Sequence, residues 1–152
     1  MILRKRAEVY IPYQGKIFVG VRGGRMVVPG GTLDTDKDTG IEETPMTAAI
    51  RECKEEIGVR PKNLKLLSNN LIVKDGWGGY THCQCWSYIG EFAAYDEKYW
   101  GNGPEGQYHR SLISFNKFIS YLKKTEREAE DAWQDVATHN IGLLKRIQNE
   151  YL

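Results

Sequence analysis

The sequence predicts an α/β or α+β sandwich formed by one domain. Several runs of apolar and β-branched residues, separated by glycine, proline and asparagine, are typical of strands. Other stretches have the three-to-four-residue apolar spacing of helices that lie on a core. The chain has 152 residues, enough for a substantial core, and no repeat or low-complexity segment divides it. We therefore expect strands mixed with a few helices in a single domain covering residues 1–152.

The first predicted elements are strands. Residues 7–22, AEVYIPYQGKIFVGVR, predict two strands around a turn at Gln14-Gly15. Residues 26–31, MVVPGG, predict a short strand that is ended by proline and glycine. Residues 32–40, TLDTDKDTG, are polar and acidic, and we expect a surface loop there.

A helix follows, with Thr44 at its N-cap, Pro45 in its first turn and Gly58 as its stop. Successive helical residues are rotated by about 100°, so three glutamates share one face within roughly 100° of arc. These glutamates are Glu52, Glu55 and Glu56. The apolar residues on the other side, which are expected to face the core, are Met46, Ile50, Cys53 and Ile57.

The second half of the chain predicts two longer strands and a helical C-terminal region. Residues 64–75 and 81–92 have strand character, and residues 93–107, rich in glycine and aromatics, are expected to form a long loop. Residues 108–121 predict a strand or its continuation into a helix. Residues 126–152 are helical in pattern.

The composition argues against several classes of protein. The formal net charge of +1 gives no electrostatic reason to expect duplex nucleic acid or an anionic membrane as a partner. The basic residues 4–6 are not followed by a long apolar run, so we expect neither a signal peptide nor a membrane span. Three cysteines, Cys53, Cys83 and Cys85, are too few for a disulfide framework and lack a second ligand pair with zinc spacing. They are expected to be reduced, partly buried thiols of a cytoplasmic protein.

The glutamate face has two interpretations when the helix is considered alone. As an ordinary solvated face, its like charges repel by roughly 0.2–0.5 kcal/mol per pair, and Arg51 offsets part of this repulsion. As a binding face it holds a divalent cation, because hard carboxylate oxygens suit Mg²⁺ or Mn²⁺. The helix by itself leaves both interpretations open and favours the solvated face.

The surrounding sequence favours the cation. Residues 29–31, PGG, precede Glu43, and seven residues later comes RECKEEIGV, residues 51–59. This pattern resembles the Nudix box of the Nudix hydrolases. It departs from the box in Cys53, at a usually aliphatic position, and in residues 32–42, a longer stretch than usual before the first glutamate. The resemblance implies a Nudix-type α/β/α sandwich with a mixed central sheet, and an enzyme in which water attacks a diphosphate bridge.

The functional residues of the family carry over onto the matching positions. The resemblance implies Mg²⁺ or Mn²⁺ ligands of two kinds: the backbone carbonyl of Gly30, and the side chains of Glu52, Glu55 and Glu56. Glu55 or Glu56 would also serve as the general base. Glu43 and Arg51 would hold the preceding loop and the helix in register.

Outside the box, the resemblance is to MutT-type nucleoside triphosphate pyrophosphohydrolases. Residues 99–107, YWGNGPEGQ, resemble a loop of these enzymes, which implies that Glu105 is a further metal ligand or base; the alternative is an exposed loop residue. Residues 16–22, KIFVGVR, would place Arg22 near the phosphates, unless it is a surface arginine. Asn140 matches a base-reading asparagine at the start of the last helix, although the spacing favours an N-cap role.

The expected activity is metal-dependent hydrolysis of the diphosphate linkage in a nucleoside diphosphate derivative, with (deoxy)nucleoside triphosphates as the first choice of substrate. ADP-ribose, nucleotide sugars, dinucleoside polyphosphates and capped RNA remain alternatives within the same chemistry. A non-catalytic Nudix-fold binding or regulatory module is a different class, which usually loses glutamates of the box, whereas this chain keeps them. We expect a nucleotide as the partner, no membrane and no duplex nucleic acid, and a monomer or homodimer.

Overall fold

The computed structural model describes residues 3–73, 82–96, 98, 108–128 and 133–152. In chain order its elements are β1 (Leu3–Tyr10), β2 (Pro12–Tyr13), β3 (Lys16–Arg22), β4 (Arg25–Val27), β5 (Gly30–Thr32), α1 (Pro45–Ile57), β6 (Val59–Val73), β7 (His82–Tyr95), β8 (His109–Ser114), α2 (Phe115–Glu128) and α3 (Trp133–Tyr151). Within these described ranges, no helix is both long enough and apolar enough to cross a membrane.

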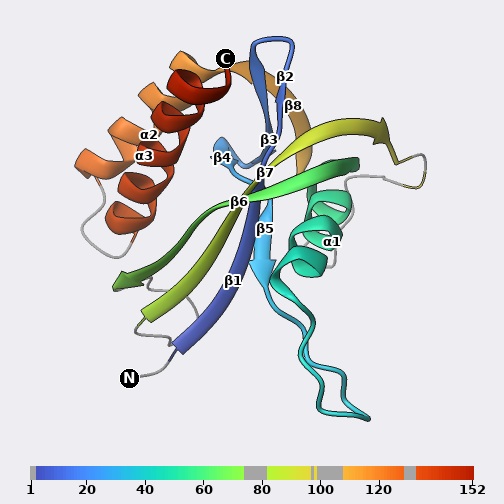
Figure 1. The fold of residues 1–152 in the computed structure, drawn as a ribbon. Coiled ribbons are helices and arrows are strands. Elements are labelled where there is room, and N and C mark those ends of the chain that lie inside the picture. The colour runs from blue at the N-terminus through green and yellow to red at the C-terminus, as the bar shows by residue number, and fades with distance from the viewer. Residues whose placement is uncertain (1–2, 74–81, 97, 99–107, 129–132) are drawn as a thin grey trace.

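The strands form a mixed four-stranded sheet in the order β5-β1-β7-β6, and a second, antiparallel sheet around β3. In the first sheet β1 and β7 run parallel, whereas β5 and β6 are antiparallel to their neighbours. In the second sheet β3 pairs with β2, β4 and β8. Figure 1 shows α1 on one side of the strands, and α2 with α3 on the other. The predicted α/β/α sandwich with a mixed central sheet is therefore confirmed.

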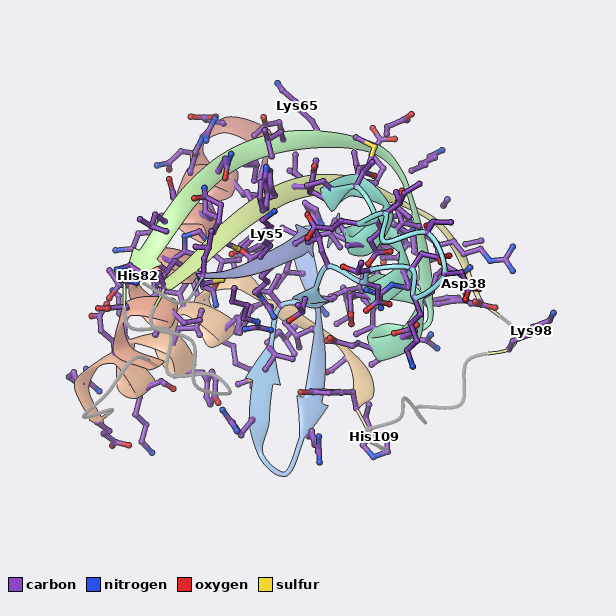
Figure 2. The ribbon with its side chains drawn as sticks, turned by 90° about the horizontal axis from the view of Figure 1, so that it is seen from below. Lys5, Asp38, Lys65, His82, Lys98 and His109 are labelled. Carbon is purple, nitrogen blue, oxygen red and sulfur yellow. The ribbon has the colours of Figure 1, made fainter. Side chains whose placement is uncertain are left out.

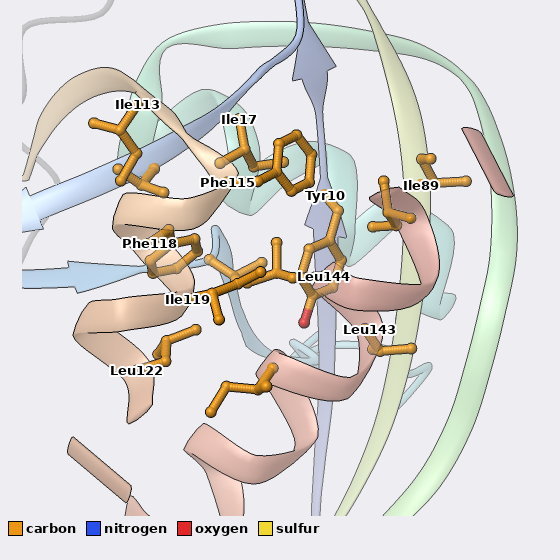
Figure 3. Close-up of a cluster of buried hydrophobic side chains, with 14 of the residues drawn as sticks. Tyr10, Ile17, Ile89, Ile113, Phe115, Phe118, Ile119, Leu122, Leu143 and Leu144 are labelled. Atoms are coloured by element: carbon orange, nitrogen blue, oxygen red, sulfur yellow. The ribbon is translucent and has the colours of Figure 1, made fainter. Parts of the chain in front are cut away.

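Apolar side chains fill both sides of the sheets. The larger cluster lies against α2 and α3 and includes Tyr10 and Leu144 (Figure 3). The smaller cluster lies under α1 and includes Ala7 and Val9 of β1. Because side chains of a strand alternate between its two faces, Glu8 points with Tyr10 toward α3, away from α1. Strand β1 therefore contributes side chains to both layers.

The buried face of α1 agrees with the predicted one at Cys53 and Ile57, whereas Ile50 is only partly buried and Met46 is exposed. Its buried residues are Ala48, Ala49, Cys53 and Ile57. Met46 was expected in the core, but it is 43% exposed. It has nearly the same angular position on the helix as Ile57 but lies in the first turn, directly after the polar segment 34–43.

Three other expectations need correction. Strand β7 includes residues 93–95, expected in a loop, because β6 starts directly after α1 and pairs with β7 as far as Val59 opposite Tyr95. The C-terminal helical region consists of two helices, α2 and α3. Asn140 lies inside α3, so its interpretation as an N-cap is wrong: its side chain contacts the hydroxyl of Tyr10 from within the helix.

Candidate active site

The three glutamates are carried by α1, whose ends form where the sequence predicts them. Oγ1 of Thr44 accepts a 3.2 Å hydrogen bond from the amide of Thr47, and Pro45 begins the helix. Gly58 ends the helix with φ at 61°, a left-handed conformation that glycine adopts readily. Both ends of α1 are thus capped, which fixes the directions of the side chains between them.

Two adjacent glycines in β5 allow close approach from both faces of the sheet. A β-carbon on Gly31 would collide with the carboxylate of Glu52. A β-carbon on Gly30 would lie 2.7 Å from Nη2 of Arg6 and 2.8 Å from the β-carbon of Glu8, on the opposite face. Since β5 has no side chains at these positions, residues of α1 and of β1 both reach its backbone.

Burial and like charge shift the ionisation of the glutamates on α1. Burial raises the pKa of Glu56 well above its usual range; the charge of Arg6 opposes this shift and that of Glu52 adds to it. The amide of Gly30 donates a hydrogen bond to the Glu56 carboxylate. Burial, followed by the charge of Glu52, also raises the pKa of Glu55. Carboxylates this close therefore hinder one another's ionisation.

Arg51 is the central cation of the cluster. Its Nη2 donates to Oε1 of Glu43 at 2.6 Å and to the carbonyl of Thr32 at 3.2 Å. Its Nη1 donates to Oε1 of Glu52 at 2.8 Å and to Oε2 of Glu55 at 3.1 Å. The hydrogen bond from Arg51 is the main reason that the pKa of Glu43 is lowered. Arg51 thereby links β5, two glutamates of α1 and the segment that precedes the helix.

The segment between β5 and α1 forms a protruding loop whose two ends are paired with each other. The amide of Glu43 donates to the carbonyl of Asp34 at 2.8 Å, and the amide of Asp34 donates to Oε1 of Glu43 at 2.9 Å. An antiparallel bridge between Thr35 and Glu42 continues this pairing. The additional residues therefore project from the sheet, and Glu43 still reaches Arg51.

The residues of this cluster fit a divalent cation. The side chain of Glu52 is only 14% exposed, and Glu56 is partly buried, which a solvated charged face does not require. Arg51 shares its charge with Glu43, so it does not neutralise the three glutamates of α1. A divalent cation would favour the ionised form of all three, and hard oxygen ligands of this kind suit Mg²⁺ or Mn²⁺.

Comparison with known proteins identifies the family. The family model described as the NUDIX domain matches residues 9–131, most of the chain. The chain belongs to the Nudix family. It is therefore an enzyme, a Nudix hydrolase of nucleoside diphosphate derivatives, and Nudix hydrolases generally use divalent metal ions. None of the curated proteins matches the sequence.

Solved Nudix structures share the fold at low sequence identity. A Nudix hydrolase from Nitrosomonas europaea matches with a TM-score of 0.59 and 15% identity, over 91% of this chain and 89% of that protein. A MutT Nudix hydrolase from Burkholderia pseudomallei matches with 0.57 and 20%, over 76% and 86%. An ADP compounds hydrolase matches with 0.62 and 15%, over 97% and 75%. At these identities the likeness establishes the fold and leaves the substrate open.

Of the remaining predicted residues, Arg22 and Asn140 make their described contacts away from the glutamates of the Nudix box. Arg22 is at the exposed end of β3, with its guanidinium carbon 5.7 Å from the centroid of the Tyr108 ring. Asn140 is buried in α3, and its Oδ1 lies 2.8 Å from the hydroxyl of Tyr10. Glu105 lies outside the described residues. The roles of these three residues therefore stay predictions.

Both flanks of the segment that contains Glu105 are anchored at the C-terminal end of the Nudix helix. The amide of Asp96 donates to the carbonyl of Gly58 at 2.8 Å. From the other flank, Nη1 of Arg110 donates to the carbonyl of Ile57 at 3.1 Å and to that of Gly58 at 3.2 Å. The chain therefore leaves and returns beside the turn of α1 that carries the last two glutamates of the box.

Arg110 is well placed to stabilise this arrangement. A cation near the C-terminus of a helix interacts favourably with the helix dipole. The guanidinium carbon of Arg110 also lies 4.1 Å from the centroid of the Tyr95 ring, a cation–π contact. In Figure 2, Lys98 and His109, which flank residues 99–107, both lie toward the side of the molecule that carries α1.

Sequence reasoning missed a buried polar network on the other face of β1. Oε2 of Glu8 lies 2.8 Å from Oγ of Ser87 and 2.9 Å from the hydroxyl of Tyr10. It also lies 3.0 Å from Nε2 of His139, in α3. The one signal in the sequence was Glu8, a carboxylate directly before the apolar residues 9–11 of a predicted strand. The network joins β1, β7 and α3.

This network is a set of hydrogen bonds at a place where side chains that can ligate a metal also converge. The ligand atoms of Glu8, Cys85 and His139 lie within 4.8 Å of one another, as a metal site requires. In this structure the Glu8 oxygen accepts hydrogen bonds from hydroxyls, and burial raises the pKa of Cys85 well above its usual range, which disfavours the thiolate in the absence of a metal ion. Ser87 and Glu8 also contact the same ring nitrogen of His139, so these residues do not form a catalytic triad.

Proposed function

We propose that this Nudix hydrolase is a Mg²⁺- or Mn²⁺-dependent (deoxy)nucleoside triphosphate pyrophosphohydrolase. The metal would be held by the carbonyl of Gly30 and the carboxylates of Glu52, Glu55 and Glu56. The observation that carries this proposal is the packing of partly buried glutamates against the Gly30–Gly31 backbone, with raised pKa values at Glu55 and Glu56. The ionised form of such a group of carboxylates is unfavourable without a cation and is favoured when a cation is bound.

The chemistry is attack of water on a phosphorus of the diphosphate bridge. The metal would supply charge neutralisation of the phosphates. A bond forms between the water oxygen and phosphorus, the bond from phosphorus to the bridging oxygen breaks, and a carboxylate accepts the proton of the water. Glu55 is favoured as this base among the box residues because its side chain is 45% exposed, whereas Glu56 is more buried. Arg51, held by Glu43, would keep Glu52 and Glu55 in position.

Three residues outside the box complete the proposal. Glu105 would be a further metal ligand or the base, supported by the anchoring of both flanks of its segment at the end of α1. Arg22 would contact phosphate, since it is exposed beside Tyr108, a residue on one of those flanks. Asn140 would contact the base only after substrate displaces the hydroxyl of Tyr10.

The preference for triphosphates is supported by the resemblance of residues 99–107 to the MutT-type loop. We also propose that residues 1–152 form one domain and act as a monomer or homodimer. A cytoplasmic location is supported by the three buried cysteines, which are thiols in the structure, since thiols persist in reducing compartments.

The test is product identification with a panel of substrates. The protein is incubated with (deoxy)nucleoside triphosphates, ADP-ribose, a nucleotide sugar, dinucleoside polyphosphates and capped RNA, with Mg²⁺ or with a chelator, and the products are separated by chromatography. We expect a nucleoside monophosphate and pyrophosphate from a triphosphate, with Mg²⁺ only. The E56Q variant, purified in the same way, controls for contaminating enzymes. Faster hydrolysis of another substrate would refute the triphosphate preference, and binding without hydrolysis would indicate a regulatory module.

A further inference from the structure

Arg6 lies on the opposite face of the glycine pair from the glutamates of the Nudix box. A β-carbon on Gly31 would meet Glu52, whereas one on Gly30 would meet Nη2 of Arg6. The charge of Arg6 acts directly on Glu56, whose ionised form it favours. Arg6 and Glu52 thus lie on opposite faces of a strip of backbone that has no side chains. Arg6 is therefore the cation of β1 next to the candidate metal site.

The contacts that hold Arg6 are long. Its Nε lies 3.7 Å from Oε1 of Glu8, beyond hydrogen-bonding distance, and its Nη2 lies 3.4 Å from the carbonyl of Val28. Glu8 directs its other carboxylate oxygen to Ser87, Tyr10 and His139. Glu8 is thus fixed without Arg6, and it supplies a stationary negative charge that orients the guanidinium. A guanidinium has five N–H donors, so Arg6 retains donors for a ligand.

Arg6 is also partly exposed. Its side chain is 21% exposed, although it belongs to a strand whose neighbouring residues are mostly buried. By contrast, Arg51 is engaged by Glu43, Glu52 and Glu55. A polyphosphate bound at the glutamates brings several negative charges, more than the shared charge of Arg51 can balance.

We propose that Arg6 binds a phosphate group of the substrate, in a charge-assisted contact from the β1 side of Gly30. A planar guanidinium matches two phosphate oxygens at once, and this bidentate geometry is the reason that arginine is preferred over lysine at such sites. The inference rests on the proposed function, because it requires a polyphosphate substrate at the Nudix box. The rival role for Arg6 is a structural ion pair with Glu8 alone.

Binding of inorganic tripolyphosphate with Mg²⁺ separates these roles without relying on activity. Calorimetry measures its affinity for the wild-type protein and for R6M, R6K and K5M. Lys5 is the matched control: it is the adjacent basic residue of β1, its side chain points to the other face, and it pairs with Glu42 at 3.1 Å. Circular dichroism and thermal unfolding verify that each variant is folded.

We expect R6M to bind tripolyphosphate at least about tenfold more weakly, R6K to be weakened by about three- to tenfold, and K5M to remain within about twofold of wild type. If R6M does not fold, the tripolyphosphate affinity of R6K, compared with those of K5M and the wild-type protein, tests the inference. Unchanged affinity in the Arg6 variants, equal losses in R6M and K5M, or no tripolyphosphate binding by the wild-type protein would each overturn the inference. Wild-type binding that R6M loses, together with no hydrolysis of any nucleotide in the panel, would refute the proposed activity and leave the role of Arg6 standing.

Discussion

The backbone amide of Asp96 donates a 2.8 Å hydrogen bond to the carbonyl of Gly58, the residue that ends the Nudix helix. Arg110 binds the same carbonyl from the other side of the intervening segment. A single helix presents only a narrow face to a metal, so ligands on the far side must come from elsewhere, and loops on a rigid scaffold commonly supply them. This pair of anchors joins the two flanks of the segment containing Glu105 to the C-terminal end of α1.

We predict that E105Q lowers kcat at least about tenfold and changes nucleotide affinity far less, because a base acts mainly on the chemical step. Steady-state kinetics with the preferred substrate, together with binding of a non-hydrolysable analogue, would measure both quantities. E97Q is the matched control from the same segment, and Asp96 and Glu91 are the other acidic residues nearby. A damaging E97Q beside a silent E105Q would show that the loop resemblance is misleading.

Replacement of Glu52 or Glu56 by glutamine should lower the rate at least about a hundredfold, or about 3 kcal/mol at the transition state. Glutamine preserves the size of the side chain and removes the charge that a divalent cation requires. E150Q, which changes an exposed glutamate of α3, is the control and should retain wild-type kinetics. Full activity of E56Q with Mg²⁺ would mean that the metal site lies elsewhere.

Metal affinity should fall as the pH is lowered. Burial raises the pKa of Glu56, so a proton competes with the cation for this carboxylate at a higher pH than for an ordinary glutamate. Calorimetric titration with Mg²⁺ at several pH values above the ordinary pKa of glutamate should therefore give weaker binding as the pH is lowered, with proton release on binding. Equal affinity and no proton release would exclude Glu56 as a ligand that titrates in this range.

The protruding loop between β5 and α1 should be dispensable for metal dependence. Asp34 and Glu43 close its base, so replacing residues 36–41 with a short turn retains the contacts that reach Arg51. The alternating aspartates superficially resemble a calcium loop, but position twelve counted from Asp34 is Pro45, not the glutamate that such loops need. The shortened protein should still require Mg²⁺. Micromolar calcium binding that is lost on mutation of these aspartates would contradict the prediction.

The network around Glu8 should stabilise the fold at neutral pH. E8Q removes a buried charge that faces Arg6 and His139, and we expect a loss of about 3 kcal/mol in the free energy of unfolding. S87A removes one hydrogen bond of the same network and should lose about 1 kcal/mol. Urea unfolding measures both. If E8Q and S87A lose equally small amounts of unfolding free energy, the buried carboxylate of Glu8 contributes little to stability.

The same network predicts a loss of stability in acid. Burial alone would raise the pKa of Glu8, but His139 and Arg6 lower it from 4.5 to about 2. The contribution of this carboxylate is therefore present above the unfolded value, near 4.5, and is lost as the pH falls toward about 2. Unfolding of the wild-type protein and E8Q at several pH values should show their difference in stability shrinking over this window. A constant difference would contradict the lowered pKa.

The local sequence determined the elements whose geometry depends on neighbours along the chain. Helix α1 was predictable from Thr44, Pro45 and Gly58, because capping involves backbone groups within one turn. The common face of Glu52 and Glu56 follows from the period of a helix. The predicted turn at Gln14-Gly15 is confirmed. Both residues have positive φ angles, which a two-residue hairpin loop of this kind requires. The spacing of the box was sufficient to predict the family.

Tertiary structure alone decided the contacts between residues far apart in sequence. His139 reaches Glu8 across 131 positions, and no local pattern encodes which helix covers which strand face. Arg6 was one basic residue among three at the start of the chain until the pairing of β1 with β5 placed it at Gly30. Met46 has the angular position of a core residue but lies in the first turn of α1 and stays exposed. Periodicity specifies the direction of a side chain, whereas only the packed sheets and helices determine what that side chain meets.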